Sequence, residues 1–232
     1  MDLSQFLTTA FLGSVLQIIL IDVLLGGDNA VVIALACRRL APTQRLRGIA
    51  LGTVAAIAMR VVLIFFALQL LAIPYLKLIG GALLLWIGIQ LLLPEDGSHS
   101  EIQASDRLWS AVKTIVVADL VMSVDNVIAI AGAAQGAAEN HRMPLVIFGL
   151  LFSIPLIVAG SQIVLKVMDR FPIVVTAGAM LLGWIAGSMA ATDHALSGLF
   201  PASGGVHYVW GAGGAVFVLL AGRYLSSRAR SP

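Results

Sequence analysis

Four aspartates lie inside long apolar segments of this 232-residue chain, namely Asp22, Asp28, Asp119 and Asp125. The other eight of its twelve acidic residues fall in the termini or in connecting segments. An aspartate at the centre of a membrane helix costs about 2.5 to 3.5 kcal/mol on insertion scales, so the four together cost roughly 10 kcal/mol. Such a cost implies a use, because carboxylates at membrane depth typically mark ion or substrate pathways.

These aspartates belong to a motif that occurs twice. The segment DVLLGGDNAVVIALA from Asp22 matches DLVMSVDNVIAIAGA from Asp119 at a shift of 97 residues, so that two Asp and one Asn coincide. Gly52 and Gly149 keep this shift in the next apolar segment. Further along, PYLKLIGGALLLWIG from Pro74 matches PIVVTAGAMLLGWIA at a shift of 98. Composition bias alone does not place Pro, Gly and Trp in register, so the chain contains an internal repeat.

Helix geometry decides which side chains of the motif share a face. On an ideal helix Asp22 and Asn29 are seven residues apart and face the same way, whereas Asp28 points about 120° aside. Unwinding at Gly26 and Gly27 would turn Asp28 and free carbonyls toward the same cavity, and the second motif has Ser-Val in their place. We therefore expect two similar but unequal sites, the second made by Asp119, Asp125 and Asn126.

Carboxylates, amide oxygens and backbone carbonyls are hard ligands that suit Mg²⁺, Ca²⁺ or Mn²⁺. His99, His141 and His194 lie in expected loops, and His207 opens the last apolar segment. A Zn²⁺ or Cu⁺ site is therefore not expected at depth. These residue types leave the choice among the three hard cations open. The candidate metal ligands are Asp22, Asp28, Asn29, Asp119, Asp125 and Asn126.

Arg60 is the basic residue that remains once the loops and the tail are counted; it lies well inside the segment 48–73 and admits two interpretations. It is either a counter-charge that compensates an empty acidic site, or a side chain that snorkels or pairs for structural reasons. The four aspartates have a matching structural interpretation, in which interhelical hydrogen bonds or an ion pair with Arg60 only hold the bundle together.

Composition identifies the setting in which these residues act. The chain is 59% hydrophobic and 11% charged, with a mean hydropathy of +1.00, and it therefore falls among membrane proteins. Its single cysteine, Cys37, rules out an internal disulfide. The net charge of +2 is attributed to cytoplasmic loops, and no nucleic-acid site is indicated. Apolar stretches predict seven transmembrane helices at roughly 7–36, 48–73, 75–93, 111–135, 144–167, 172–191 and 207–225.

The fold expected is an all-α polytopic membrane protein with a single transmembrane domain, residues 1–232. Repeat 1 covers 7–93, a solvated linker 94–110, repeat 2 111–191, and a seventh helix 207–225. The first segment is long and contains two adjacent glycines, which indicates a break or a strong tilt. Three crossings per repeat force the second copy to enter from the opposite side, so the repeats are inverted and a site is expected between them.

The basic residues predict the orientation. With seven spans, eleven lysines and arginines fall on one side and two on the other. By the positive-inside rule, the amino terminus lies outside and the carboxyl terminus lies in the cytoplasm, as expected for a protein integral to the cell (inner) membrane.

The segments GGDNAVVIAL and MSVDNVIAIA, with GGALLLWIGIQLL after the first, resemble the TerC family of integral membrane proteins, in particular its short YjbE/YkoY type. The resemblance covers roughly residues 8–225. It implies two inverted three-helix repeats plus one helix, a place in the LysE-like superfamily of lysine exporters, and manganese export. It also implies that the six candidate ligands bind the metal, although Gly27 has Val124 as its counterpart, which leaves flexibility at the second site open.

The function expected is a secondary transporter that exports Mn²⁺, with the metal as transported substrate and no prosthetic cofactor. Its environment is the lipid bilayer, protonation of the aspartates would couple export to inward proton movement, and a homo-oligomer remains open. Two alternatives stay open: an exporter of an amino acid or another small solute, and a non-transport assembly factor for membrane complexes. An enzyme is not expected, because GGDN and SVDN do not match the GxGD context of intramembrane aspartyl proteases.

Overall fold

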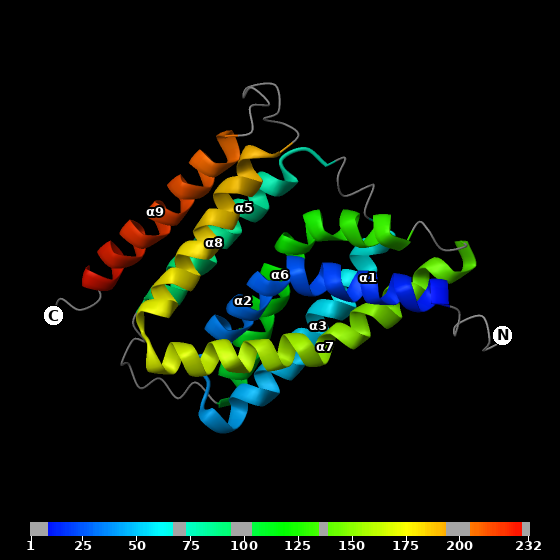
Figure 1. Cartoon of the computed structure of the whole chain (residues 1–232). Helices are drawn as coiled ribbons and strands as arrows, with labels where there is room; N and C mark the ends of the chain where they lie inside the picture. Colours follow the sequence, from blue (N-terminus) through cyan, green and yellow to red (C-terminus); the bar gives the residue numbers. More distant parts are fainter. Residues whose placement is uncertain (1–8, 67–72, 94–103, 135–138, 194–204, 229–232) are drawn as a thin grey trace.

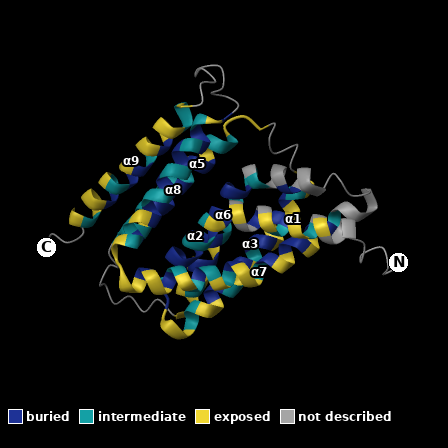
Figure 2. Cartoon of the chain, in the orientation of Figure 1, coloured by how far each residue is buried: buried dark blue, intermediate teal, exposed yellow. Residues whose placement is uncertain are grey.

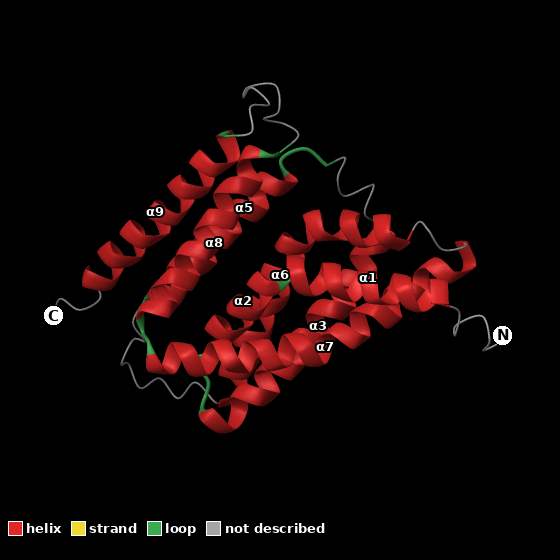
Figure 3. Ribbon diagram, viewed as in Figure 1, coloured by secondary structure: helices red, strands yellow, loops and turns green. Residues whose placement is uncertain are grey.

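The computed structural model describes residues 9–66, 73–93, 104–134, 139–193 and 205–228 (Figure 3). All regular structure in these ranges is helical, which confirms the predicted all-α class. The helices in chain order are α1 (Thr9–Leu25), α2 (Gly27–Cys37), α3 (Pro42–Phe65), α5 (Leu76–Leu92), α6 (Ala104–Ala134), α7 (Glu139–Arg170), α8 (Ile173–Ala191) and α9 (Val206–Arg228).

The first predicted span consists of two helices, because α1 ends at Leu25 and α2 begins at Gly27. Gly26 between them still donates its N–H to the Asp22 carbonyl at 2.7 Å. A Cβ at Gly26 would lie 2.3 Å from that carbonyl oxygen, so only glycine fits the break. Of the two expected alternatives, a break or a tilt, the structure has the break. The matching positions of the second motif lie inside the unbroken helix α6.

Helix α6 begins earlier than the sequence indicates. The solvated linker was expected to extend to residue 110, but Ala104 already starts the helix, and residues 94–103 lie outside the described ranges. Regular helix thus begins within the segment expected to be the linker. Hydropathy marks where a helix enters the apolar region, not where it begins, and the first turn of α6 is exposed, with Asp106 stabilising its positive end.

Two groups of helices are visible in Figure 1. Helices α5, α8 and α9 run side by side and contact one another, and α1, α2, α3, α6 and α7 form the other group. Glycines bring α8 and α9 close together, since a Cβ on Gly183 or Gly187 would meet the backbone of Gly214 or Trp210. Small residues of this kind allow helix backbones to approach each other in membranes.

The packing of the second group crosses between the two halves of the sequence. Helix α1 packs against α7, and α3 packs against α6. Gly52 on α3 lies against the Ile115 side chain on α6, and Gly149 on α7 lies against Ile18 on α1. Both the two glycines and the two isoleucines are separated by 97 residues, the shift of the repeat. The two contacts are therefore equivalent in sequence.

A buried carboxylate positions the start of α5. Tyr75 before this helix is left-handed, with φ 63°, and it provides no side-chain cap. The Asp193 carboxylate instead accepts hydrogen bonds from the backbone N–H groups of Tyr75 and Leu78, each at 3.1 Å. The segment that follows α8 thus caps α5 and joins the start of α5 to the end of α8.

The helices have exposed and buried faces (Figure 2), and the exposed residues include many large apolar side chains, as in a membrane protein. Large apolar side chains such as Leu20, Val62, Leu156 and Phe217 are exposed. Several charged and polar side chains, among them Asp22, Arg60 and Asp119, are buried. Among the described residues, four helical segments are long and apolar enough to cross a membrane, namely 42–65, 143–170, 173–191 and 206–228.

Candidate functional site

A buried ion triad joins the two halves of the sequence. The guanidinium of Arg60, 1% exposed on α3, forms ion pairs with Asp22 on α1 through Nη1 and with Asp119 on α6 through Nη2. Arg60 lies on the face of α3 that carries the buried Ala56, Ile57 and Leu63, so the helix directs it inward. The aspartates coincide in the repeat, and the structure brings them to one cation.

Hydroxyl groups engage the remaining carboxylate oxygens. Ser153 Oγ, on α7, donates to Asp22 Oδ2, and Ser123 Oγ donates to Asp119 Oδ2 at 3.0 Å. Ser123 Oγ also accepts from Arg60 Nε at 3.0 Å. Each of the four carboxylate oxygens therefore accepts a hydrogen bond, and the donors come from α3, α6 and α7. This arrangement offsets much of the cost of burying the charges.

The charges of this triad do not balance. One guanidinium contributes +1 and two carboxylates contribute −2, which leaves −1 in a region where all three side chains are buried. Asp28, half-buried in the first turn of α2, is a further acidic group of the same motif. An excess of negative charge in a low-dielectric interior attracts cations.

The first motif continues across the break. Asp28 is half-buried in the first turn of α2, and its Oδ1 accepts the N–H of Asn29 at 2.8 Å. The positive end of α2 stabilises this carboxylate. The Asn29 side chain is buried, and neither Oδ1 nor Nδ2 has a hydrogen-bond partner among the described residues. A buried amide without partners is costly, so Asn29 is available to a ligand.

The second motif is less completely described. Asn126 is half-buried on α6, seven residues after Asp119, and the side chain of Asp125 lies outside the described residues. Among the side chains that the structure describes, no three His, Cys, Asp or Glu come together as a metal-binding group. The predicted residues that the structure brings together are thus Asp22 and Asp119, through Arg60, with Asn29 and Asp28 at the neighbouring break.

Sequence reasoning missed the two serines of this site. Ser123 carries a signal, because it lies four residues after Asp119 and so shares its helix face. Ser153 carries none, since its repeat counterpart is Ala56. Arg60 itself has Ile157 as counterpart. The site therefore combines equivalent aspartates with partners that are not equivalent.

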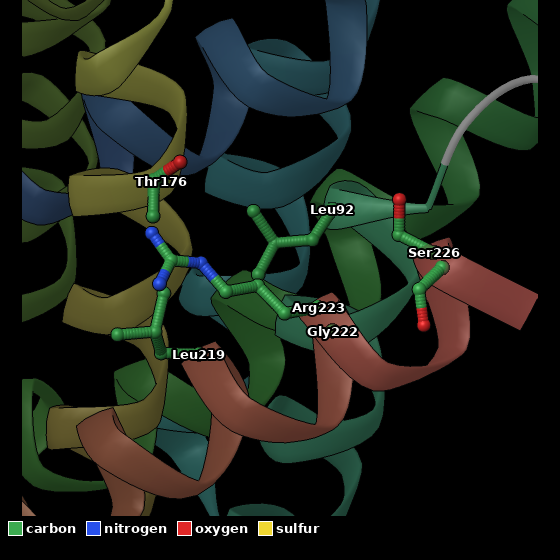
Figure 4. Close-up of a pocket in the computed structure, with 7 residues that line it drawn as sticks. Leu92, Thr176, Leu219, Gly222, Arg223 and Ser226 are labelled. Atoms are coloured by element: carbon green, nitrogen blue, oxygen red, sulfur yellow. The ribbon is translucent and has the colours of Figure 1, made fainter.

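The described helices also line open pockets away from these aspartates. Figure 4 shows one of about 480 Å³ at the ends of α5, α8 and α9, where the Arg223 guanidinium lies beside Thr176. It holds no carboxylate and is therefore unsuited to a metal cation. A second pocket of about 470 Å³ lies between the same helices and is almost wholly apolar, lined by residues such as Leu85, Ala186 and Phe217.

Comparisons with known proteins agree with this architecture. The chain is 44% identical to the uncharacterized membrane protein YjbE of Bacillus subtilis (strain 168), over 92% of this chain and 95% of YjbE. It is 23% identical to YceF of the same organism, over 78% of this chain and 71% of YceF. It is also 23% identical to YkoY of that organism, over 75% of this chain and 58% of YkoY. No solved structure matches significantly. The family model for integral membrane protein TerC matches residues 7–230, so the chain belongs to the TerC family of integral membrane proteins.

Proposed function

We propose that this protein is a secondary transporter that exports a divalent metal cation, Mn²⁺, across the cell (inner) membrane. The observation that carries the proposal is the convergence of Asp22 and Asp119 on a single buried cationic group. The two aspartates are equivalent in the repeat, and they come from different helices. A place in a membrane protein where two buried carboxylates already hold one cation is suited to another.

The oxygen atoms at this site fit a hard cation. Asp22 and Asp119 supply carboxylate oxygens, Ser123 and Ser153 supply hydroxyls, and the Asn29 amide has no protein partner among the described residues. All of these ligands are oxygen atoms, which Mn²⁺, Mg²⁺ and Ca²⁺ accept. The choice of Mn²⁺ rests on the resemblance to the family. We include Asp28, Asp125 and Asn126 in the proposed metal pathway as motif residues.

The proposed architecture is seven spans in two inverted repeats plus one helix. Helices α1 and α2 together form the first span. The equivalent contacts of Gly52 with Ile115 and of Gly149 with Ile18 support an exchange of partners between repeats. A pseudo-two-fold relation requires such an exchange. In this arrangement the aspartates lie at the interface of the repeats, where inverted-repeat transporters bind their substrates.

Contacts at one end of the bundle support the proposed orientation. Arg45, at the start of α3, forms an ion pair of 2.5 Å with Asp169 at the end of α7. The Arg39 guanidinium, just after α2, donates to the carbonyls of Gln90 and Leu93 at the end of α5. Segments expected on the cytoplasmic side thus contact one another, in keeping with an external amino terminus and a cytoplasmic carboxyl terminus.

The same site argues against an exporter of amino acids. A substrate carboxylate would need a cationic partner in the interior, and Arg60 is the in-span candidate. Its guanidinium is already engaged by Asp22 and Asp119. No chemical step on the metal is invoked, so the proposed activity is transport and not catalysis.

Flux in liposomes tests the proposal. Purified protein is reconstituted, and uptake of Mn²⁺, Ca²⁺ and Mg²⁺ is measured with and without an opposing proton gradient. We expect Mn²⁺ flux that the proton gradient accelerates, because protonated carboxylates release metal. Asp22→Asn and Asp119→Asn are expected to abolish the flux, whereas Asp106→Asn, an exposed position at the start of α6, leaves it unchanged. Wild-type Mn²⁺ flux in all three variants would overturn the proposal.

A further inference from the structure

Arg60 occupies the position in which the proposed function places a divalent cation. Its two terminal nitrogens bind separate carboxylates, and its Nε donates to Ser123. With Ser153 and Ser123 on the outer oxygens, all four carboxylate oxygens are engaged. A metal ion that binds Asp22 and Asp119 together must therefore displace donors that the protein itself supplies.

The two cations cannot share this position. A divalent ion between Asp22 and Asp119 would lie against the guanidinium, and the two cations would repel each other in a buried, weakly screened environment. A divalent ion alone balances the two carboxylates, whereas the guanidinium alone leaves −1. Exchange of one for the other is therefore favoured by charge, and it requires the Arg60 side chain to move away.

We propose that Arg60 is a tethered competitor of the transported cation, which holds the aspartates when no metal is bound and leaves them when metal binds. This inference rests on the proposed function and adds the regulation of its site. Arg60 acts by occupying Asp22 and Asp119 and is not itself a metal ligand. It keeps the empty carrier stable, because a buried carboxylate pair without a cation is strongly unfavourable.

The inference also explains how binding reaches the rest of the bundle. Arg60 belongs to α3, which packs against both α6 and α7. Displacement of its side chain from Asp22 and Asp119 removes the ion pairs that join α3 to α1 and α6. Substrate binding is thereby coupled to the position of one helix relative to the two first helices of the repeats, a condition for alternating access.

The test measures Mn²⁺ binding to purified protein in nanodiscs, from the loss of the free Mn²⁺ electron paramagnetic resonance signal as MnCl₂ is titrated. Removing a competitor strengthens binding, so Arg60→Gln is expected to bind Mn²⁺ roughly tenfold more tightly or better than wild type. Arg60→Lys keeps the charge but cannot reproduce the fork of donors, so it falls between the two. Arg45→Gln, which removes an ion pair with the half-exposed Asp169, is the control with unchanged affinity.

A second measurement covers the case in which Arg60→Gln fails to fold without metal. MnCl₂ is then expected to restore its thermal unfolding transition, because the metal takes the place of the guanidinium. The triple variant Arg60→Gln, Asp22→Asn, Asp119→Asn has no buried charge to compensate and is expected to fold without MnCl₂. A purely structural arginine predicts no rescue by metal, and absence of rescue in Arg60→Gln overturns the inference.

The two proposals fail in different ways. Tighter Mn²⁺ binding by Arg60→Gln together with no Mn²⁺ flux in wild type would overturn transport and retain the competition. Wild-type Mn²⁺ flux together with equal or weaker binding by Arg60→Gln would retain transport and overturn the competition.

Discussion

At the scale of single residues, the interior contains polar groups in two conditions. The charged groups Asp22, Arg60 and Asp119 have partners at every carboxylate oxygen. The neutral groups of Asn29 and Thr53 are buried, and their side-chain atoms have no partner among the described residues. Unpaired buried groups cost about 1 to 3 kcal/mol each. Each of these groups therefore either binds a ligand or only lowers the stability of the protein. Substitution can distinguish the two explanations.

Apolar substitution distinguishes the two cases. Asn29→Leu and Thr53→Val each remove an unpaired buried group, so both are expected to raise the free energy of unfolding of the metal-free protein by about 1 kcal/mol. The measurement is unfolding by SDS in mixed micelles. Only Asn29→Leu is expected to lower Mn²⁺ flux in liposomes, because Thr53 lies outside the motif. If Asn29→Leu transports as well as Thr53→Val, the Asn29 amide is not a ligand.

At the scale of elements, the break between α1 and α2 determines how the residues of the first motif are oriented relative to one another. It separates Asp22, at the end of one helix, from Asp28 and Asn29, at the start of the next. The break exposes the positive end of α2 to Asp28 and leaves the Asn29 amide beside Gly26. Helix α6 has no such break, so its hydroxyl at Ser123 bonds to Asp119 within one helix.

Two adjacent glycines allow a matched test of the break. A Cβ at Gly26 would lie 2.3 Å from the Asp22 carbonyl oxygen and 3.2 Å from Asn29 Nδ2, whereas one at Gly27 meets nothing within 4 Å. Gly26→Ala is expected to destabilise the protein by about 1 to 3 kcal/mol through overpacking. Gly27→Ala is expected to be neutral or stabilising by up to about 1 kcal/mol. Thermal unfolding in detergent measures both, and similar losses would contradict this account.

At the scale of the whole molecule, the described contacts relate the two halves of the chain. First and second helices exchange partners between halves, and the third helices, α5 and α8, pack on each other. The repeat does not extend to three residues of the site. The positions equivalent to Arg60, Ser123 and Ser153 in the other half of the chain carry different residue types. In the transporter that we propose, the framework would follow the repeat and the site would not, so that its two faces need not bind the cation equally.

Cysteine labelling tests the proposed orientation of the whole molecule. In a Cys37→Ala background, single cysteines are placed at Ala104 and Gly205, both exposed helix starts. A maleimide that does not cross membranes is expected to label Gly205→Cys in intact cells. It is expected to label Ala104→Cys only after permeabilisation, because the linker before α6 is cytoplasmic in the proposed topology. Labelling of both positions in intact cells would contradict the seven-span arrangement.

Particular residues show how far the sequence reaches. The aspartates were found from composition and register, because hydropathy makes a charge in an apolar segment conspicuous. The sequence leaves open whether Arg60 pairs with these aspartates, since it does not show which helices lie beside Arg60. Ser153 was not found at all, because a serine in a membrane helix is common and its counterpart is Ala56. Hydropathy does not reveal that α6 begins at Ala104, because the first turn of this helix is polar.

By itself, the sequence determined the helical membrane class, the duplicated Asp/Asn motif and the position of glycine at a weak point of the first span. These follow from hydropathy, periodicity and residue type, which are local properties. Only the tertiary structure decided that the weak point is a break and that Asp22 and Asp119 share one guanidinium. The break depends on the local backbone geometry at Gly26, which residue type alone does not fix. The shared guanidinium depends on contacts between segments distant in the chain, where a cation must lie within bonding distance of both carboxylates.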